Sequence, residues 1–112
     1  MGKLMRETFD RQELEARAQE VSQLLKSLAN PNRLMIVCTL LEGERSVAEL
    51  ENELGIHQPT LSQQLTALRE AGLVQTRRES RHIYYRLKDD KTAQVIEALY
   101  RIFCSDQTAE VS

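Results

Sequence analysis

Near the middle of this sequence two short amphipathic stretches are joined by a tight turn, and this pattern constrains the fold more than any other feature. Ser46 and Glu49 have the spacing of a capping box, in which the serine accepts an early backbone N–H and the glutamate reaches back. Gly55 can adopt the left-handed backbone that ends a helix. A second helix is predicted to open near Gln58-Pro59, because the first turn of a helix tolerates proline. The sequence therefore predicts a helix-turn-helix over residues 46–72.

The second of these helices has an apolar face and a polar face. Leu61, Leu65 and Leu68 recur at i, i+4 and i+7 and predict a buried stripe. The opposite face consists of short polar side chains, which can read base edges by hydrogen bonds. The candidates for DNA contact are Gln58, Thr60, Ser62, Gln63 and Thr66. Taken alone, an ordinary solvated helix face explains the same pattern equally well.

A two-stranded ribbon is predicted over residues 74–87. Its flanks are rich in β-forming residues, and Ile83, Tyr85 and Leu87 alternate. The turn lacks Asn-Gly or Asp-Gly, so the hairpin is predicted from its strands alone. Arginines at a hairpin tip suit phosphate or a narrow minor groove, although a solvated charge cluster is the alternative. The basic candidates are Arg77, Arg78, Arg81 and His82. Two helices followed by a basic ribbon predict a winged helix-turn-helix that binds double-stranded DNA.

The charge of the chain is unevenly distributed. The whole sequence has a net charge of −2. Residues 57–88 contain six basic and two acidic residues, a net charge of +4, so the rest of the chain carries −6. A basic surface on an acidic body suits a protein whose affinity for DNA depends on one oriented face.

Three more helices are predicted around this unit. The first, over residues 12–28, has apolar residues spaced 4, 3, 4 and 3 apart, a heptad-like seam that core packing would also explain. These residues are Leu14, Ala18, Val21, Leu25 and Leu28. The second begins at Asn30-Pro31, as cap and first helical residue. Its apolar stripe is Leu34, Val37, Cys38 and Leu41. The last helix covers residues 89–104. We predict that the first and last helices join two copies in a homodimer. Each copy then contributes one helix-turn-helix with its wing, called a reading head below, to a palindromic site.

Residues 1–112 are predicted to form a single winged helix-turn-helix domain, mainly α, with about five helices plus a two-stranded wing. At 112 residues and 41% hydrophobic, the chain can bury a modest core. No apolar stretch approaches membrane length and the N-terminus has no secretory pattern, so we expect no membrane contact and a cytoplasmic location. An enzyme is not expected, because a Gly-rich phosphate loop and a catalytic Ser/His/Asp set are both missing.

Three motifs spread along the chain carry a family resemblance. They are Leu-Ala-Asn-Pro-Asn-Arg-Leu at 28–34, Gln-Pro-Thr-Leu-Ser-Gln-Gln-Leu at 58–65 and Leu-Arg-Glu-Ala-Gly-Leu-Val at 68–74. They resemble the ArsR/SmtB family of bacterial repressors over nearly the whole chain. The resemblance implies a dimer interface on the first and last helices and an inducer that lowers operator affinity. Two departures are His57, where a serine cap is common, and Gln64, where many members have histidine.

The resemblance also bears on metal sensing. Many family members bind metals or arsenic through Cys-x-Cys on the first helix of the helix-turn-helix, but residues 46–50 contain no cysteine. Others use carboxylates and histidines on the last helix, which here has Asp89 and Asp90 but no histidine. Two cysteines without a third and fourth ligand make a poor zinc site. We therefore expect no metal and no cofactor, and a metal- or arsenic-sensing repressor of the same fold is the alternative.

From the residues alone, Cys38 and Cys104 are open to two interpretations. They are either inert buried thiols or a transient redox pair, because structural disulfides are rare in the cytosol. Inert cysteines would also fit a winged-helix module that binds a protein. Their sequence surroundings, however, resemble the dithiol pair of the persulfide-sensing subgroup of this family. That resemblance implies reactive sulfur species as inducer and sulfide-detoxification genes as targets.

Simple thiol chemistry describes how such a pair could work. One thiolate attacks a persulfide and the second thiol resolves the product. A direct disulfide needs Cα atoms within about 7 Å, whereas inserted sulfur atoms bridge a wider gap. The apolar stripe should discourage the thiolate of Cys38, and Arg101 could favour that of Cys104. The sequence does not establish which cysteine reacts first, the number of bridging sulfurs or the operator.

Overall fold

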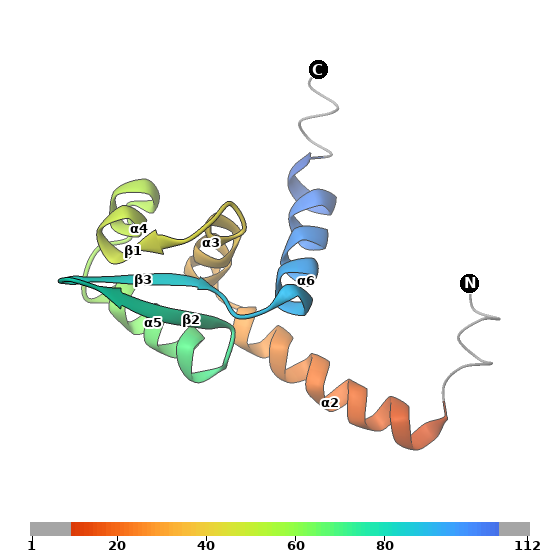
Figure 1. The fold of residues 1–112 in the computed structure, drawn as a ribbon. Helices are drawn as coiled ribbons and strands as arrows, with labels where there is room; N and C mark the ends of the chain where they lie inside the picture. Colours follow the sequence, from red (N-terminus) through yellow and green to blue (C-terminus); the bar gives the residue numbers. More distant parts are fainter. Residues whose placement is uncertain (1–9, 106–112) are drawn as a thin grey trace.

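The computed structural model describes residues 10–105, which fold into five α-helices and a small antiparallel sheet (Figure 1). The predicted fold class is therefore confirmed, while residues 1–9 and 106–112 of the predicted domain lie outside the described residues. The elements are α2 (Arg11–Leu28), α3 (Pro31–Leu40), β1 (Arg45–Ser46), α4 (Val47–Leu54), α5 (Thr60–Glu70), β2 (Val74–Glu79), β3 (His82–Leu87), α6 (Asp90–Tyr100) and the π-helical turn η1 (Arg101–Ser105).

The predicted starts of α3 and α4 are confirmed by their caps. The Asn30 side chain accepts the backbone N–H of Arg33 at 3.1 Å, and proline occupies the first helical position. In α4 both halves of the capping box form: Ser46 Oγ accepts from the Glu49 N–H at 3.1 Å, and the Glu49 carboxylate accepts from the Ser46 N–H at 2.8 Å. Gly55 ends this helix with a φ of +71°. Local chemistry therefore defines these boundaries.

The start of α5 differs from the prediction. The helix begins at Thr60, so Pro59 is the N-cap residue and not the first helical residue. A proline in that position has no side-chain oxygen to offer as a cap. The side chain of Gln58 supplies the capping oxygen instead, because Oε1 of Gln58 accepts the backbone N–H of Ser62 at 3.0 Å.

The sheet has three strands in the order β1-β3-β2, one more than predicted. The additional strand, β1, is only two residues long and pairs with Tyr84 and Tyr85 of β3. The hairpin strands are longer than predicted, because their register runs from Val74 opposite Leu87 to Glu79 opposite His82. The turn therefore contains only Ser80, which has a φ of +61°, and Arg81.

A single core joins the helices to the inner end of the hairpin. Leu61, Leu65 and Leu68 of α5 are almost fully buried, as predicted. The predicted stripe of α3 was partly wrong, since Ile36 and Leu40 are buried whereas Leu34 is 37% exposed. Helix α3 packs against α2, α4, α5, α6 and β3, and a helix surrounded on several sides has no single apolar face for periodicity to detect.

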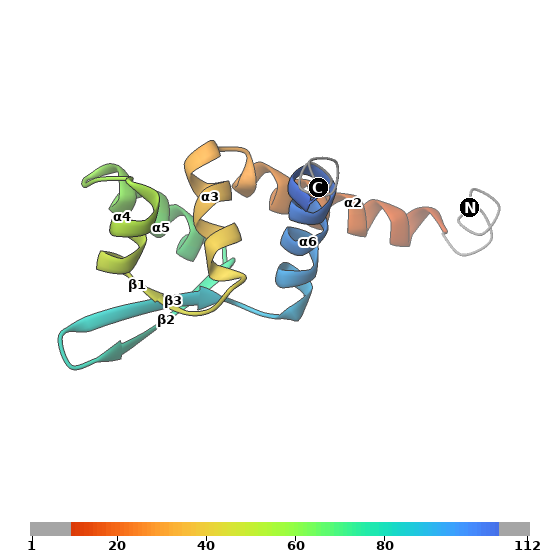
Figure 2. The ribbon, with the colours of Figure 1, turned by 90° about the horizontal axis from the view of Figure 1, so that it is seen from above.

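Helix α2 projects away from this body, and α6 stands beside α3 (Figures 1 and 2). The radius of gyration is 16.5 Å, larger than the roughly 13 Å expected of a compact domain of this length. The last helix is shorter than predicted, because α6 ends at Tyr100 and a π-helical turn carries the chain onward. Among the described residues, no helix is long and apolar enough to cross a membrane.

Candidate nucleic-acid interface and dithiol pair

Helix α5 presents a continuous polar surface. Ser62, Gln63 and Thr66 are exposed on the side opposite the buried leucines, Thr60 is half-buried at the first turn, and Gln58 is exposed just before it. Hydroxyl and amide groups on one exposed helix face are suited to hydrogen bonding with base edges. The structure thus places Gln58 just before α5 and the other four predicted residues in its first two turns, toward the end that a recognition helix presents to the major groove.

Two glutamines of this region have partners within the molecule. The Gln58 carbonyl oxygen accepts from the backbone N–H and the hydroxyl of Ser62, which leaves its amide NH₂ as the group that can donate outward. Gln64 is half-buried and accepts from Arg33 Nε at 2.9 Å. The same arginine donates from Nη1 to the backbone carbonyl of Ser27 at 2.9 Å. Arg33 on α3 therefore ties α5 to the end of α2, a role that the sequence did not reveal.

The predicted position of the wing arginines needs correction. Of the three, only Arg81 lies in the turn, because Arg77 and Arg78 belong to strand β2. Successive side chains of a strand point to opposite faces, so Arg77 shares a face with Glu79 and Arg78 lies on the other. Arg78, Arg81 and His82 are exposed, and within residues 10–105 neither Arg78 nor Arg81 has an ion-pair partner.

Arg77 is held by other residues of the chain. Its Nε lies 2.9 Å from both carboxylate oxygens of Glu44, and its Nη2 lies 2.8 Å from one of them. Its Nη1 donates to Glu79 at 2.9 Å, and the guanidinium carbon lies 4.6 Å from the centre of the Tyr84 ring. Hydrogen bonding to Arg77 lowers the pKa of the Glu44 carboxyl group from its ordinary value. All three guanidinium nitrogens thus have carboxylate partners.

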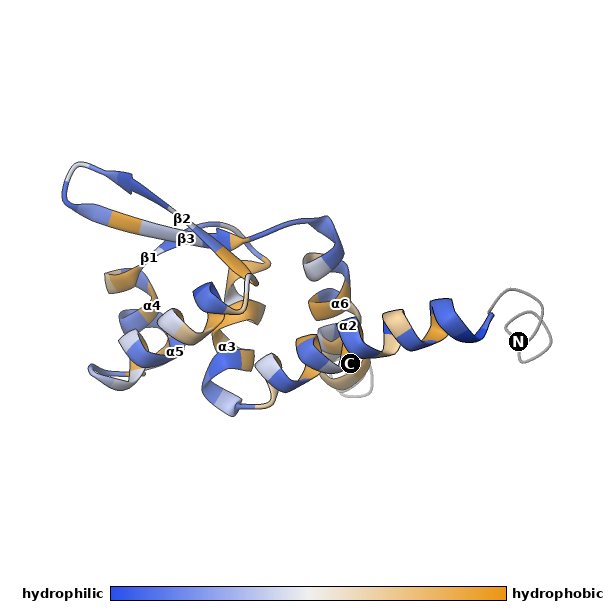
Figure 3. Cartoon of the chain, turned by 90° about the horizontal axis from the view of Figure 1, so that it is seen from below, coloured by the Kyte–Doolittle hydropathy of each residue, from blue (hydrophilic) through white to orange (hydrophobic). Residues whose placement is uncertain are grey.

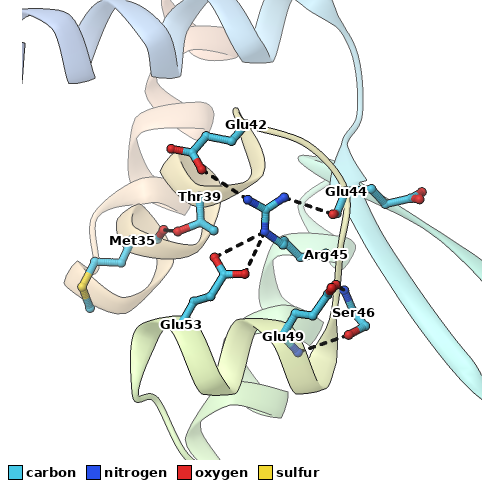
Figure 4. A network of polar contacts seen from close by, with 8 residues as sticks. All are labelled: Met35, Thr39, Glu42, Glu44, Arg45, Ser46, Glu49 and Glu53. Atoms are coloured by element: carbon cyan, nitrogen blue, oxygen red, sulfur yellow. Dashed lines mark hydrogen bonds and ion pairs between the residues drawn. The ribbon is translucent and has the colours of Figure 1, made fainter.

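Glu44 belongs to the segment that connects α3 to β1, and this segment is itself fixed by ion pairs (Figure 4). Arg45 contacts Glu42 at 3.2 Å and Glu53 of α4 at 3.0 Å. Its Nη1 also donates to the backbone carbonyl of Glu44 at 3.2 Å. The connection is therefore attached to α4 through Arg45 and to the wing through Glu44.

The two cysteines lie on neighbouring elements. Cys38 on α3 is half-buried and packs against the core, and Cys104 on the π-helical turn is exposed. Burial raises the pKa of the Cys38 thiol above its ordinary value, and the nearby Cys104 raises it further through charge repulsion. The two residues are 66 positions apart in sequence, yet Cys104 lies close enough to Cys38 to raise the pKa of its thiol, and no disulfide joins them.

Within residues 10–105, no three or more His, Cys, Asp or Glu side chains are grouped so that they could hold a metal ion. Of the two acids at the start of the last helix, Asp89 has a structural role at the helix terminus. Asp89 caps the helix by accepting the Thr92 N–H at 2.9 Å, which lowers the pKa of its carboxyl group.

Comparison with known proteins identifies the family. Residues 30–76 match the model of the bacterial regulatory protein family arsR. A biofilm growth-associated repressor from Agrobacterium fabrum is 63% identical over 94 residues, which cover 84% of this chain and 80% of the relative. The chain belongs to the ArsR family. The predicted family resemblance is thus confirmed, and members of this family are transcriptional regulators.

Solved structures extend the similarity of this ArsR-family chain to its fold. The crystal structure of the transcriptional repressor BigR from Xylella fastidiosa has a TM-score of 0.79 at 59% identity, covering 87% of this chain and 96% of that one. Reduced HlyU from Vibrio cholerae has the same TM-score at 42% identity, covering 84% of this chain and 99% of that one. HlyU is named a transcriptional activator, whereas the two proteins of higher identity are named repressors.

Proposed function

We propose that this chain is a dimeric transcriptional repressor that releases a palindromic operator when reactive sulfur species join Cys38 to Cys104. The repressor would act in the cytoplasm, and its targets would be sulfide-response genes. The observation that carries the proposal is the proximity of the two cysteines in an ArsR-family protein: Cys104, beyond α6, lies near enough to Cys38 of the central helix to raise the pKa of its thiol. Repression is favoured over activation because the relatives that are 63% and 59% identical are named repressors, whereas HlyU, at 43%, is named an activator.

The DNA-binding part of the proposal rests on two surfaces. The exposed hydroxyl and amide groups of α5 would read bases in the major groove, and Arg78, Arg81 and His82 of the wing would contact the backbone. Substitution of Gln63 by alanine should therefore reduce discrimination between sequences. Substitution of Arg78 or Arg81 should weaken binding to all sequences.

The dimeric part rests on apolar side chains that nothing covers within the described chain. They lie on α2, at the end of α6 and in η1, within the two helices predicted to form the dimer interface. Figure 3 shows hydrophobic residues recurring along α2. The exposed side chains are Leu14, Val21, Leu25, Tyr100, Ile102 and Phe103. Large apolar side chains that are left about half exposed or more on these elements favour an interface with another chain, so a second copy is the proposed cover.

The sulfur chemistry needs no external oxidant. The Cys104 thiolate attacks the sulfane sulfur of a persulfide RSSH, RSH leaves, and Cys104 becomes a persulfide. A second RSSH converts Cys38 in the same way. The outer sulfur of the Cys38 persulfide then attacks Sγ of Cys104, the bond from Sγ to its own outer sulfur breaks, and that sulfur leaves as hydrogen sulfide. Two RSSH and two thiols thus give one trisulfide, two RSH and one H₂S.

A bond between these residues would join elements with different roles. Cys38 lies on α3, which packs against α5 and β3, whereas Cys104 follows α6 at the proposed dimer interface. The bond would therefore alter the orientation of each reading head relative to its partner. A two-headed protein loses affinity when its heads no longer match successive major grooves.

The proposal is tested by intact-protein mass spectrometry combined with operator binding. Treatment of the reduced protein with a persulfide should add one or more sulfur atoms and remove two hydrogens within one chain. Operator affinity should fall by roughly 5- to 150-fold, the usual range of allosteric coupling.

The Cys38→Ser and Cys104→Ser variants serve as matched controls. Each should bind the operator as tightly as the parent when reduced, and each should stay bound after persulfide. Release by both serine variants would show that the thiols are bystanders. A reduced protein that binds a selected palindrome no better than random DNA at matched salt would exclude the repressor itself.

A further inference from the structure

The three wing arginines differ in what they contact. Arg78 is exposed on one face of β2 and Arg81 is exposed in the turn, and within residues 10–105 neither has an ion-pair partner. Arg77 is the exception, because Glu44, Glu79 and Tyr84 surround its guanidinium group. Because several of its five N–H donors already face carboxylates, Arg77 has fewer donors left for phosphate than Arg78 or Arg81.

The partner that matters most is Glu44, because it comes from another part of the chain. Glu79 is two residues from Arg77 on the same strand, so their ion pair holds nothing beyond the hairpin. Glu44 is 33 residues away, in the connection between α3 and β1, and its side chain is only 27% exposed. The bidentate contact with Arg77 therefore attaches the wing to the helical body.

The body side of this attachment is itself fixed. Arg45, the next residue, pairs with Glu53 of α4 and donates to the Glu44 backbone carbonyl. Residues 45 and 46 also pair with β3, so the connection lies against both the first helix of the helix-turn-helix and the wing. Glu44 is thus presented to Arg77 by a segment with little freedom to move.

From this arrangement we infer that Arg77 is a positioning residue, which orients the wing through Glu44, and that phosphate contact belongs to Arg78 and Arg81. Two-stranded ribbons twist strongly and are only marginally stable alone, so a wing needs an external contact to hold one direction. The backbone pairing of β1 with β3 supplies one such contact, and the ion pair with Glu44 adds a side-chain contact on strand β2. The inference rests on the proposed DNA-binding function and assigns separate tasks to three similar side chains.

Salt dependence distinguishes the two roles. Log affinity falls with log salt concentration, and each phosphate contact contributes about 0.9 to the steepness of this fall. Loss of one contact per head therefore reduces the steepness for a dimer by about 2. The probe is a duplex selected from a random library with the reduced, full-length protein. Arg78→Gln and Arg81→Gln should each lower the slope by this amount. Arg77→Gln should weaken binding by roughly three- to thirtyfold while the slope stays unchanged.

Glu44→Ala provides a second, independent arm. The substitution removes a negative charge close to the DNA-binding face, so a purely electrostatic effect would strengthen binding. If Glu44 positions the wing, the variant should instead weaken binding as much as Arg77→Gln. The double variant should be no weaker than either single variant, because both disrupt one contact. Arg77→Lys should recover little affinity, because an ammonium group cannot make the bidentate contact.

Glu42→Ala is the matched control. It removes an acidic residue from the same connection, and the partner of Glu42 is Arg45 and not the wing. This variant should bind DNA as tightly as the parent or more tightly. The Glu44→Ala and Glu42→Ala variants should have similar melting temperatures, so that a loss of binding cannot be assigned to a loss of fold.

Each outcome is informative. A lower salt slope in Arg77→Gln, equal to that in Arg78→Gln, would overturn the positioning role, as would tighter binding by Glu44→Ala. If all three arginine variants leave the slope unchanged while the parent still selects a duplex, the wing does not contact phosphate and the inference fails. If the parent selects no duplex, the proposed function itself fails.

Discussion

The two cysteines have different surroundings, and their nucleophilic reactivity should differ accordingly. Cys38 is half-buried against the core, and burial raises the pKa of its thiol above the ordinary value of 9.0. Because the thiolate is the reactive form, a raised pKa leaves less of it at neutral pH. Cys104 is exposed in the single chain. The exposed thiol is therefore the better first nucleophile, a question that the sequence left open.

Alkylation of the reduced protein measures this difference. Iodoacetamide at neutral pH should modify Cys104 before Cys38, and the Cys38 rate should continue to rise as the pH increases above 9.0, the ordinary value. Peptide mass spectrometry at a series of pH values follows both residues. The Cys104→Ser variant should show a small increase in the Cys38 rate, because the smaller, electrostatic contribution to its pKa is gone. Equal rates for the two thiols at neutral pH would contradict this prediction.

At the scale of elements, α3 occupies the central position. It contacts α5, α6 and β3, and it carries both Cys38 and Arg33. Arg33 holds α5 through Gln64 and the end of α2 through the Ser27 carbonyl. A displacement of α3 would therefore be passed to the recognition helix by side-chain hydrogen bonds as well as by core packing.

Substitution of Arg33 tests this connection. Arg33→Met should leave the half-buried Gln64 carbonyl oxygen without its donor and destabilise the fold by about 1–3 kcal/mol. Operator discrimination should fall as well, because α5 loses its link to α2. Adding Gln64→Leu should restore part of the stability, since replacement of both partners by apolar groups is less costly than removal of one. Urea unfolding gives the stabilities.

The control for this series is Arg69→Met, which removes the same charge from an exposed position of α5. It should change stability by no more than about 0.5 kcal/mol. If Arg33→Met is as stable as Arg69→Met, the hydrogen bonds of Arg33 contribute nothing to the fold.

The elements that could be predicted from sequence are those defined by short-range chemistry. The capping box of Ser46 and Glu49, the Asn30 cap and the left-handed Gly55 all involve residues within one helical turn of the boundary they define. The α5 stripe was also predictable, because α5 buries a single face. Each of these features is encoded within a few consecutive residues.

The features that sequence did not reveal depend on distant partners. Strand β1 has two residues and exists because β3, almost 40 positions later, pairs with it. The role of Arg77 depends on Glu44, which no local pattern connects to the wing. The same holds for the contact between Arg33 and Gln64, 31 positions apart. A run of arginines therefore indicated a basic wing but did not distinguish the arginine that positions it from those that face outward.

At the scale of the whole molecule, the shape of the chain indicates a missing partner. Its radius of gyration of 16.5 Å exceeds the roughly 13 Å of a compact domain because α2 extends beyond the body. Val21 and Leu25 of this helix are 48% and 51% exposed, and they belong to the predicted heptad-like seam. A second copy would cover them and place two heads on one face of the DNA.

From the proposed two-headed dimer we predict that tight operator binding requires dimerisation. A glutamate at Val21 or Leu25 would bury a charge in the proposed interface, which is costly without a partner, so each variant should be monomeric. Gln19→Glu is the control, because it adds the same charge to the opposite side of α2. Sedimentation should show a dimer for the control and a monomer for the seam variants.

Operator affinity of the monomeric variants should be on the order of 100-fold lower, because the second head no longer binds as part of the same molecule. The control should bind as the parent does. Each monomeric variant should also bind a half-site duplex as well as it binds the full palindrome, since one head uses only one half. A seam variant that is monomeric yet retains the affinity of the parent would show that a single head suffices, and the two-headed mechanism of release would then have no basis.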